Sequence, residues 1–138
     1  MARKTTTRDD QGLGNARAWA TEIRKMVADL HRAEEADDDR AMDSARERIT
    51  ESALSVEVRS GWYSPGCDDD RKKPEEGCIL LSTGGPALRI RCNLDEYGYP
   101  SDAIMEHQDW GTPWIEYHPG SADAKDILYF ASQFWFGS

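Results

Sequence analysis

The sequence predicts a single α+β domain with an N-terminal helical hairpin, an antiparallel sheet of about four to five strands and a C-terminal helix packed on the sheet. Apolar residues recur at helical steps of three and four before residue 54 and again after residue 121. Between these segments they alternate with polar residues, which is the period of a half-buried strand. The chain has 138 residues, a length that suits one hydrophobic core.

A tail and a first helix are expected at the start of the chain. Residues 1–10 are polar and are expected to be disordered, so that the folded domain covers residues 11–138. Gly12 and Gly14 mark the end of this tail, and Asn15, a preferred N-cap residue, begins the helix. The apolar face of the helix, within residues 15–33, consists of Trp19, Ile23, Met26, Val27 and Leu30.

An acidic run separates the first helix from a second one. Residues 34–39 contain five acids, which favour the start of a helix because the helix dipole stabilises negative charge at its N-terminus. We therefore expect a break near Asp37 and a second helix that ends near Ala53. One continuous, bent helix is the alternative interpretation.

The middle of the chain predicts a strand, a loop and a hairpin. Residues 54–62 alternate between apolar and polar side chains, as in a strand. Residues 63–77 are rich in proline, glycine and charge, and they are expected to form a mobile loop. Residues 78–83 and 87–93 are two apolar segments on either side of a Gly-Gly-Pro turn, which predicts a β-hairpin.

Two further strands and a final helix complete the predicted fold. The strands are expected near residues 103–109 and 114–118, with the turn Gly-Thr-Pro between them. Ser121 begins the last helix, and Gly137 ends it. Aliphatic residues are scarce, so we expect the aromatic residues to supply much of the core, and Trp110 and Trp114 to be buried.

The cysteines and the N-terminal sequence indicate a cytoplasmic protein. The spacing of Cys67, Cys78 and Cys92 matches no zinc site, and an odd number does not close a disulfide framework. Cys78 and Cys92 fall in predicted strands, where they are expected to be small buried side chains. No apolar segment resembles a signal peptide or a membrane span, so no membrane partner is expected.

No catalytic, cofactor or metal motif stands out, so none is expected. Ser82 lies in STGG, but Pro86 and a strand follow where a phosphate-binding loop requires lysine and a helix. The aspartate runs 37–39 and 68–70 lack the alternating ligands of a calcium loop. His107 and His118 lie in adjacent predicted strands, and they are the best candidates for acid–base chemistry.

Negative charge is concentrated toward the C-terminus. The whole chain has a formal charge of −9, and residues 95–138 contain eight acids and one base, a net charge of −7. Such a surface repels nucleic acid and attracts basic proteins. Glu106 and Glu116 are expected to share one sheet face in a row of carboxylates. The residues that we expect to bind a partner are Asp95, Glu96, Asp102, Glu106, Asp109, Trp110, Trp114 and Glu116.

Two segments resemble small proteins that bacteriophages and prophages carry. They are CILLSTGGPALRIR at 78–91 and QDWGTPW at 108–114, and the resemblance covers residues 54–138. It implies an accessory gene product. Small acidic phage accessory proteins are often antagonists of host defence, anti-CRISPR proteins among them.

Three hypotheses for the function follow. The first is an inhibitor that imitates a nucleic-acid backbone and occupies the basic surface of a nucleic-acid-binding complex, such as a CRISPR–Cas effector in the host cytoplasm. The second is a small hydrolase or modifying enzyme that uses His107 or His118 with an adjacent carboxylate. The third is a phage structural or assembly protein. The sequence leaves the oligomeric state open, including a homodimer.

Overall fold

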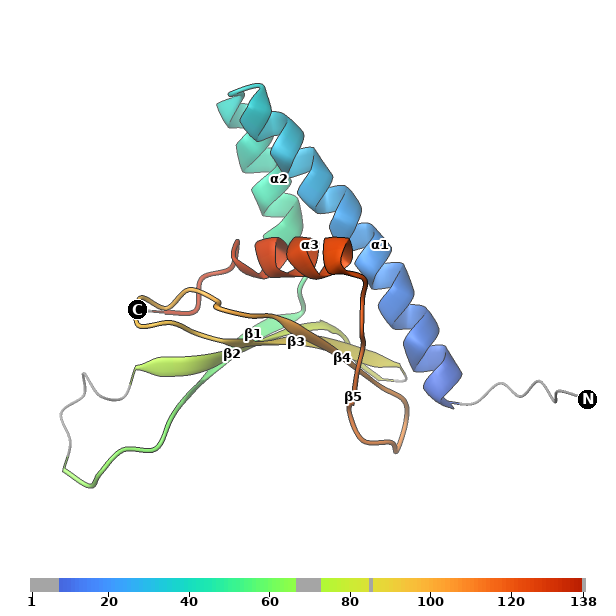
Figure 1. Ribbon diagram of the computed structural model, residues 1–138, viewed down its shortest axis with the longest axis vertical. Helices are drawn as coiled ribbons and strands as arrows, with labels where there is room; N and C mark the ends of the chain where they lie inside the picture. Colours follow the sequence, from blue (N-terminus) through green and yellow to red (C-terminus); the bar gives the residue numbers. More distant parts are fainter. Residues whose placement is uncertain (1–7, 67–72, 85, 138) are drawn as a thin grey trace, which may run out of the picture.

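The computed structural model describes residues 8–66, 73–84 and 86–137, and it confirms the α+β class (Figure 1). Three helices lie on one side of a five-stranded antiparallel sheet, in the strand order β1-β2-β3-β4-β5. In chain order the elements are α1 (Arg8–Glu35), α2 (Asp39–Glu51), β1 (Ser55–Ser60), β2 (Pro74–Ser82), β3 (Ala87–Asn93), β4 (Ile104–Gln108), β5 (Ile115–Glu116) and α3 (Ser121–Ala131).

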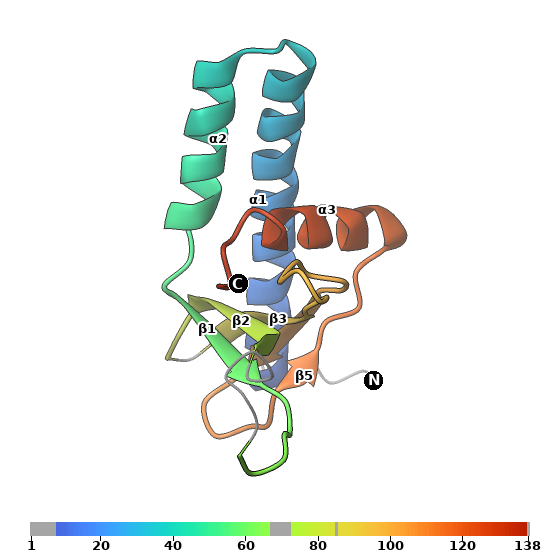
Figure 2. The same cartoon turned by 90° about the vertical axis from the view of Figure 1, so that its left-hand side faces the viewer.

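Two separate helices, and not one bent helix, form the N-terminal hairpin. Asp37 adopts a left-handed backbone conformation with φ of 53°, which reverses the chain between α1 and α2. Asp38 then caps α2, because its carboxylate accepts a hydrogen bond from the amide of Ala41 at 3.1 Å. Figure 2 shows the two helices side by side, with their connected ends pointing away from the sheet.

The first helix begins at Arg8, seven residues before the predicted start at Asn15. Asn15 is not an N-cap: its side chain donates to the hydroxyl of Ser82 at 3.1 Å. Gly12 and Gly14 lie inside the helix, and Gly12 donates its amide to Asp109 at 3.1 Å. These long-range contacts offset the low helix propensity of glycine. Of the expected tail, residues 1–7 lie outside the described residues.

The sheet follows the predicted order, with different strand limits. The hairpin of β2 and β3 is confirmed, and Ile79 lies opposite Ile90. β2 begins at Pro74, so its first four residues lie in the segment that was expected to be a loop. The amide of Leu94, just after β3, donates to the carbonyl of Glu75 in β2, so the two segments stay hydrogen-bonded beyond the end of β3. Residues 67–72 of that segment lie outside the described residues.

One face of the sheet forms the core with α1 and α3. Alternate residues of β2, β3 and β4 face these helices, whereas the residues between them belong to the face away from the helices. α3 lies over the sheet beside α1, whose N-terminal part reaches the sheet itself, and α2 lies farther from the sheet (Figure 1). The largest fully buried side chains come from all of these elements and include Ile23, Leu30, Ile49, Ile79, Ile90, Met105 and Phe130.

Candidate functional site

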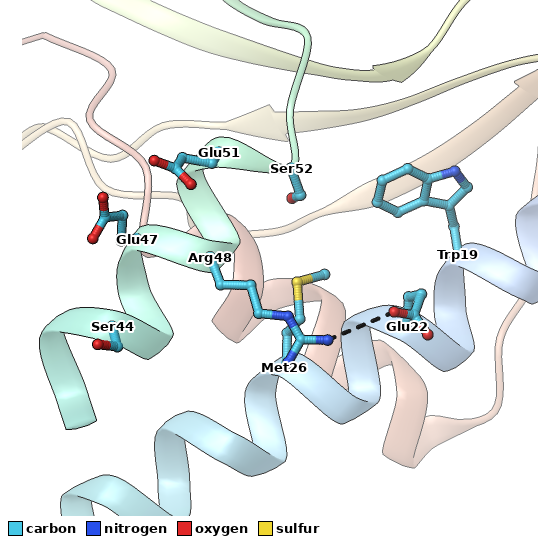
Figure 3. Close-up of a pocket in the computed structure, with 8 residues that line it drawn as sticks. All are labelled: Trp19, Glu22, Met26, Ser44, Glu47, Arg48, Glu51 and Ser52. Carbon is cyan, nitrogen blue, oxygen red and sulfur yellow. Dashed lines mark ion pairs between the residues drawn. The ribbon is translucent and has the colours of Figure 1, made fainter.

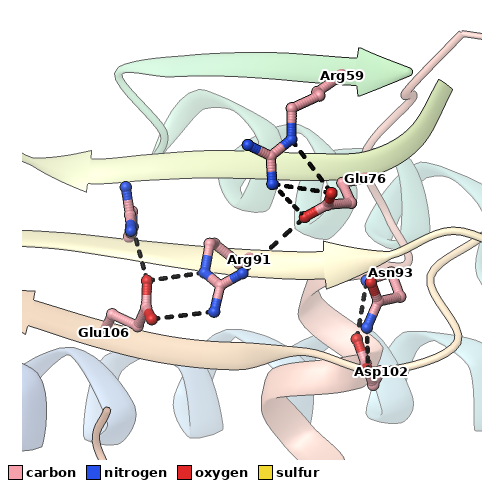
Figure 4. Close-up of polar contacts among 7 residues, drawn as sticks. Arg59, Glu76, Arg91, Asn93, Asp102 and Glu106 are labelled. Carbon is pink, nitrogen blue, oxygen red and sulfur yellow. Dashed lines mark hydrogen bonds and ion pairs between the residues drawn. The ribbon is translucent and has the colours of Figure 1, made fainter. Parts of the chain in front are cut away.

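Alternating charges cross the open face of the sheet, which is the face away from the helices. Arg59 on β1 pairs with Glu76 on β2, and Arg91 on β3 pairs with Glu106 on β4 (Figure 4). The shortest N–O distances are 2.8 Å for Arg59–Glu76 and 2.9 Å for Arg91–Glu106. Arg89 also donates to Glu106, at 2.7 Å. We call these five residues the charge ladder.

The charge ladder lowers the pKa of its carboxyl groups. Burial raises the pKa of Glu106, but hydrogen bonds from Arg91 and Arg89 outweigh that effect, so the pKa lies below its ordinary value of 4.5. The hydrogen bonds from Arg59 lower the pKa of Glu76. Both carboxyl groups are therefore ionised at neutral pH.

The guanidinium of Arg89 also lies over the ring of Trp114, 4.0 Å from its centroid.

The row of carboxylates expected at Glu106 and Glu116 does not form a bare anionic surface. The two residues lie opposite each other, as their positions predicted. Glu106, however, is only 8% exposed and is held by two guanidinium groups, so its charge is neutralised. Glu116 is exposed, and its carboxylate lies 3.6 Å from the ring of His118.

The β4–β5 turn buries one expected binding residue and exposes another. Asp109 is buried, and its carboxylate accepts the Gly12 amide. Trp110 is 70% exposed, so the prediction that it is buried is wrong. The physical reason is the turn: the hydroxyl of Thr112 bonds the amide and the carbonyl of Asp109, and the tight loop turns the ring of Trp110 outward. Trp114 is half-buried against Arg89.

His107 and His118 lie in different environments. His107 is buried on the helix side of the sheet next to Gly12 and Asp109. Its Nδ1 has no hydrogen-bond partner among the described residues, and neither has the Oδ1 of Asp109. His118 is exposed beside Glu116. A buried and an exposed histidine do not form one acid–base pair for a substrate in solution.

A hollow with a volume of about 610 Å³ lies at the end of the sheet where β2 begins and β3 ends. Among the described residues, four acids and one base, Lys73, line it. Glu75 and Glu96 are exposed, whereas Glu76 belongs to the charge ladder. We call this region the acidic hollow; its lining residues are Lys73, Pro74, Glu75, Glu76, Asn93, Leu94, Asp95 and Glu96.

The turn beside the acidic hollow is ordered by two aspartates. Asp95 accepts hydrogen bonds from the amides of Tyr97 and Tyr99 at 2.9 and 3.0 Å. Asp102 accepts from both the backbone and the side chain of Asn93 at 2.8 Å (Figure 4). Both tyrosine rings are exposed. Asp95 therefore lines the hollow and anchors the turn that carries the two exposed rings, and Asp102 is held by Asn93, another residue of the lining.

The structure divides the expected binding residues between two ends of the sheet. Asp95, Glu96 and Asp102 lie at the acidic hollow, whereas Trp110, Trp114 and Glu116 lie near the β4–β5 turn at the other end of β4. Sequence reasoning missed Glu75 and the two tyrosines. The signal for the tyrosines is DEYGYP at 95–100, a turn sequence in which acids stand next to aromatic residues.

A second hollow, of about 440 Å³, lies between α1 and α2 (Figure 3). The ring of Trp19 forms one side of it, and Met26 forms part of its floor. Arg48 extends across it to Glu22 at 3.8 Å. Three glutamates line this groove, but Arg48 pairs with one of them across its centre, so the groove does not present its acids as one open cluster.

The described residues hold no metal cluster and no reactive thiol. No group of three or more histidine, cysteine, aspartate or glutamate side chains gathers there in a way that could bind a metal ion. Burial raises the pKa of the Cys92 thiol to about 12, and burial also raises the pKa of Cys78. Both lie in strands, as predicted, and only Cys92 is fully buried. Cys67 lies outside the described residues.

None of the helices, as far as the structure describes them, has the length and apolar character needed to cross a membrane. Comparisons with protein-family models, with curated proteins and with solved structures give no match.

Proposed function

We propose that this protein is a non-catalytic binding protein that occupies a basic, nucleic-acid-binding surface of another protein. The acidic hollow is the observation that carries the proposal. It places Glu75, Asp95 and Glu96 beside one another although they come from two separate segments of the chain. Surfaces that bind nucleic acid present arginine and lysine to the phosphates, and clustered carboxylates compete for the same groups.

The exposed tyrosines add a second kind of contact. A guanidinium that lies against the ring of Tyr97 or Tyr99 gains a cation–π interaction in addition to its ion pair with a nearby carboxylate. Because Asp95 anchors the backbone of both tyrosines, the turn loses little conformational freedom on binding. The expected partner is an arginine-rich cleft, in the first instance that of a nucleic-acid-guided defence complex in bacteria.

Charge reversal in the acidic hollow tests the proposal. The double variant E75K/E96K reverses two exposed acids, and E35K/D43K makes the same change in net charge on the helical hairpin. In a pull-down from bacterial lysate that contains CRISPR–Cas effector complexes, wild type and E35K/D43K should retain an effector at low salt and release it at high salt. E75K/E96K should retain none.

A displacement assay separates the proposed function from adventitious capture. The retained complex, loaded with labelled DNA, should release the DNA when wild-type protein is added, and E75K/E96K should not release it. Retention that is insensitive to salt, or equal retention by both double variants, would contradict the proposal. Circular dichroism of each variant confirms that the fold is intact.

A further inference from the structure

Within the described residues, the edge of the sheet at β1 is covered by no other strand and contains neither of the residues that most often block pairing, proline and lysine. All six residues of β1 are exposed, and within the described part of the chain the strand pairs only with β2. Its sequence, SVEVRS, contains neither proline nor lysine, and the irregularity in its register falls at its last residue. An edge strand presents unpaired backbone donors and acceptors to any strand that approaches. The opposite edge, β5, is only two residues long.

Apolar side chains line one side of this edge. Val56 and Val58 lie opposite Ile79 and Gly77, so they point to the helix side of the sheet. The helices leave these valines uncovered. Val58 is 47% exposed, and Leu54, just before the strand, is exposed as well. This leaves an apolar stripe along the outermost strand, where another strand would bury it.

The charges on the other side of β1 are self-complementary. Glu57 and Arg59 lie on the open face, on either side of Val58 in the sequence. If two copies of β1 pair antiparallel about a two-fold axis at Val58, each Glu57 lies opposite Arg59 of the other copy. The same register places Val58 against Val58. The neighbouring register, centred on Glu57, would place two glutamates opposite each other, which is unfavourable.

Arg59 can contact Glu57 of a second copy while it remains bonded to Glu76 of its own chain. It donates to Glu76 of its own chain through Nε and Nη2. A guanidinium carries five N–H donors, so one arginine can hold two carboxylates. Its side chain is mostly exposed, and therefore open to a second copy.

From these observations we infer that the protein forms a homodimer through antiparallel pairing of β1 with β1, which joins the two sheets into one continuous sheet. The inference goes beyond the proposed function and does not depend on it. The interface consists of one strand from each copy, so the dimer is weak and forms at high protein concentration.

Sedimentation equilibrium of the purified full chain, from about 10 µM to about 1 mM, tests the dimer without any partner. The mass should rise toward twice that of one chain. Val58→Lys places two ammonium groups against each other at the axis, and it should raise the dimer dissociation constant by about tenfold or more. Ile115→Lys, the matched change on the opposite edge, should leave the dissociation constant unchanged.

Charge exchange tests the register. Glu57→Arg alone places arginine opposite arginine and should weaken the dimer, whereas E57R/R59E restores opposite charges and should recover it. Hydrogen exchange should show the β1 amides better protected at high than at low concentration. A monomer at all concentrations, a dimer that Val58→Lys leaves intact, or a double variant no tighter than Glu57→Arg would each overturn the inference.

Discussion

At the scale of single residues, Glu106 is the group on which the open face depends most. It lies on a central part of the sheet, and it accepts hydrogen bonds from both Arg89 and Arg91. Its removal leaves two guanidinium groups without their carboxylate in a partly buried site. Glu116, directly opposite on β5, is exposed and makes no such contacts with them.

We therefore expect Glu106→Gln to lower the free energy of unfolding by about 2 kcal/mol. The control Glu116→Gln should change it by less than about 0.5 kcal/mol. Urea denaturation of the two variants and the wild type measures both values. Equal effects of the two changes would show that the ladder contributes no more than an exposed charge.

Gly12 is the second residue whose contacts are specific. A Cβ atom there would lie 2.7 Å from Nδ1 of His107 and 2.9 Å from Oδ2 of Asp109. Both side chains are buried, so they have little room to move. Gly14, two residues further along α1, has nothing within 4 Å of its Cβ position.

Substitution by alanine should have opposite effects on stability at Gly12 and at Gly14. Gly12→Ala should destabilise the protein by about 1–3 kcal/mol because of the steric overlap. Gly14→Ala should stabilise it by up to about 1 kcal/mol, since alanine has the higher helix propensity. Thermal unfolding followed by circular dichroism distinguishes them, and a stabilising Gly12→Ala would contradict the close approach of α1 to β4.

At the scale of elements, the segment after α3 fixes the C-terminus onto the start of β2. The ring of Phe136 lies against Gly77, where a Cβ atom would come within 2.5 Å of it. Phe136 is buried, whereas its neighbour Trp135 is 81% exposed. The absence of a side chain at Gly77 is what lets the ring pack directly on the strand.

Phe136→Ala is expected to cost about 3 kcal/mol of stability, because it leaves a cavity over β2. Trp135→Ala removes a larger side chain from the surface and should cost less than about 1 kcal/mol. Guanidinium denaturation provides the comparison. A larger loss for Trp135→Ala would mean that the C-terminal segment packs in another orientation.

At the scale of the whole molecule, stability should depend on pH through carboxyl groups whose pKa is lowered. Hydrogen bonds from Tyr129 to Glu34 and from Arg59 to Glu76 lower the pKa of each acid, and Glu106 is lowered by its two arginines in spite of burial. A carboxyl group with a lower pKa in the folded state stabilises that state above its unfolded pKa. This stabilisation is lost as the pH falls through the folded pKa.

The melting temperature should therefore fall as the pH decreases from 7 to 3, with most of the change below the ordinary carboxyl pKa of 4.5. Glu106→Gln should melt lower than wild type at pH 7, and the difference should become smaller as the pH falls below 4.5 and protonation removes the charge of Glu106. Scanning calorimetry at intervals across this range makes the measurement. A gap of constant size would assign the effect of the variant to packing instead of charge.

Local sequence patterns specify the types of the elements and their order. The change of apolar period near residue 54 marks the passage from helices to strands, and Gly84 with Pro86 fixes the hairpin, because these are local properties of the chain. Opposed positions on neighbouring strands, such as Glu106 and Glu116, also follow from parity once the turn is known. The break at Asp37 followed from the run of acids.

The partner of each polar group, in contrast, follows from contacts that form when the chain folds. Gly12 and Asn15 are helical residues of α1 that bond to Asp109 and Ser82, which lie at least 67 residues away in the sequence. The negative charge of Glu106 is balanced by two arginines of β3 that lie beside it. The acidic hollow forms where the start of β2 lies next to the end of β3. Such environments depend on contacts between distant segments, and a local pattern does not encode them.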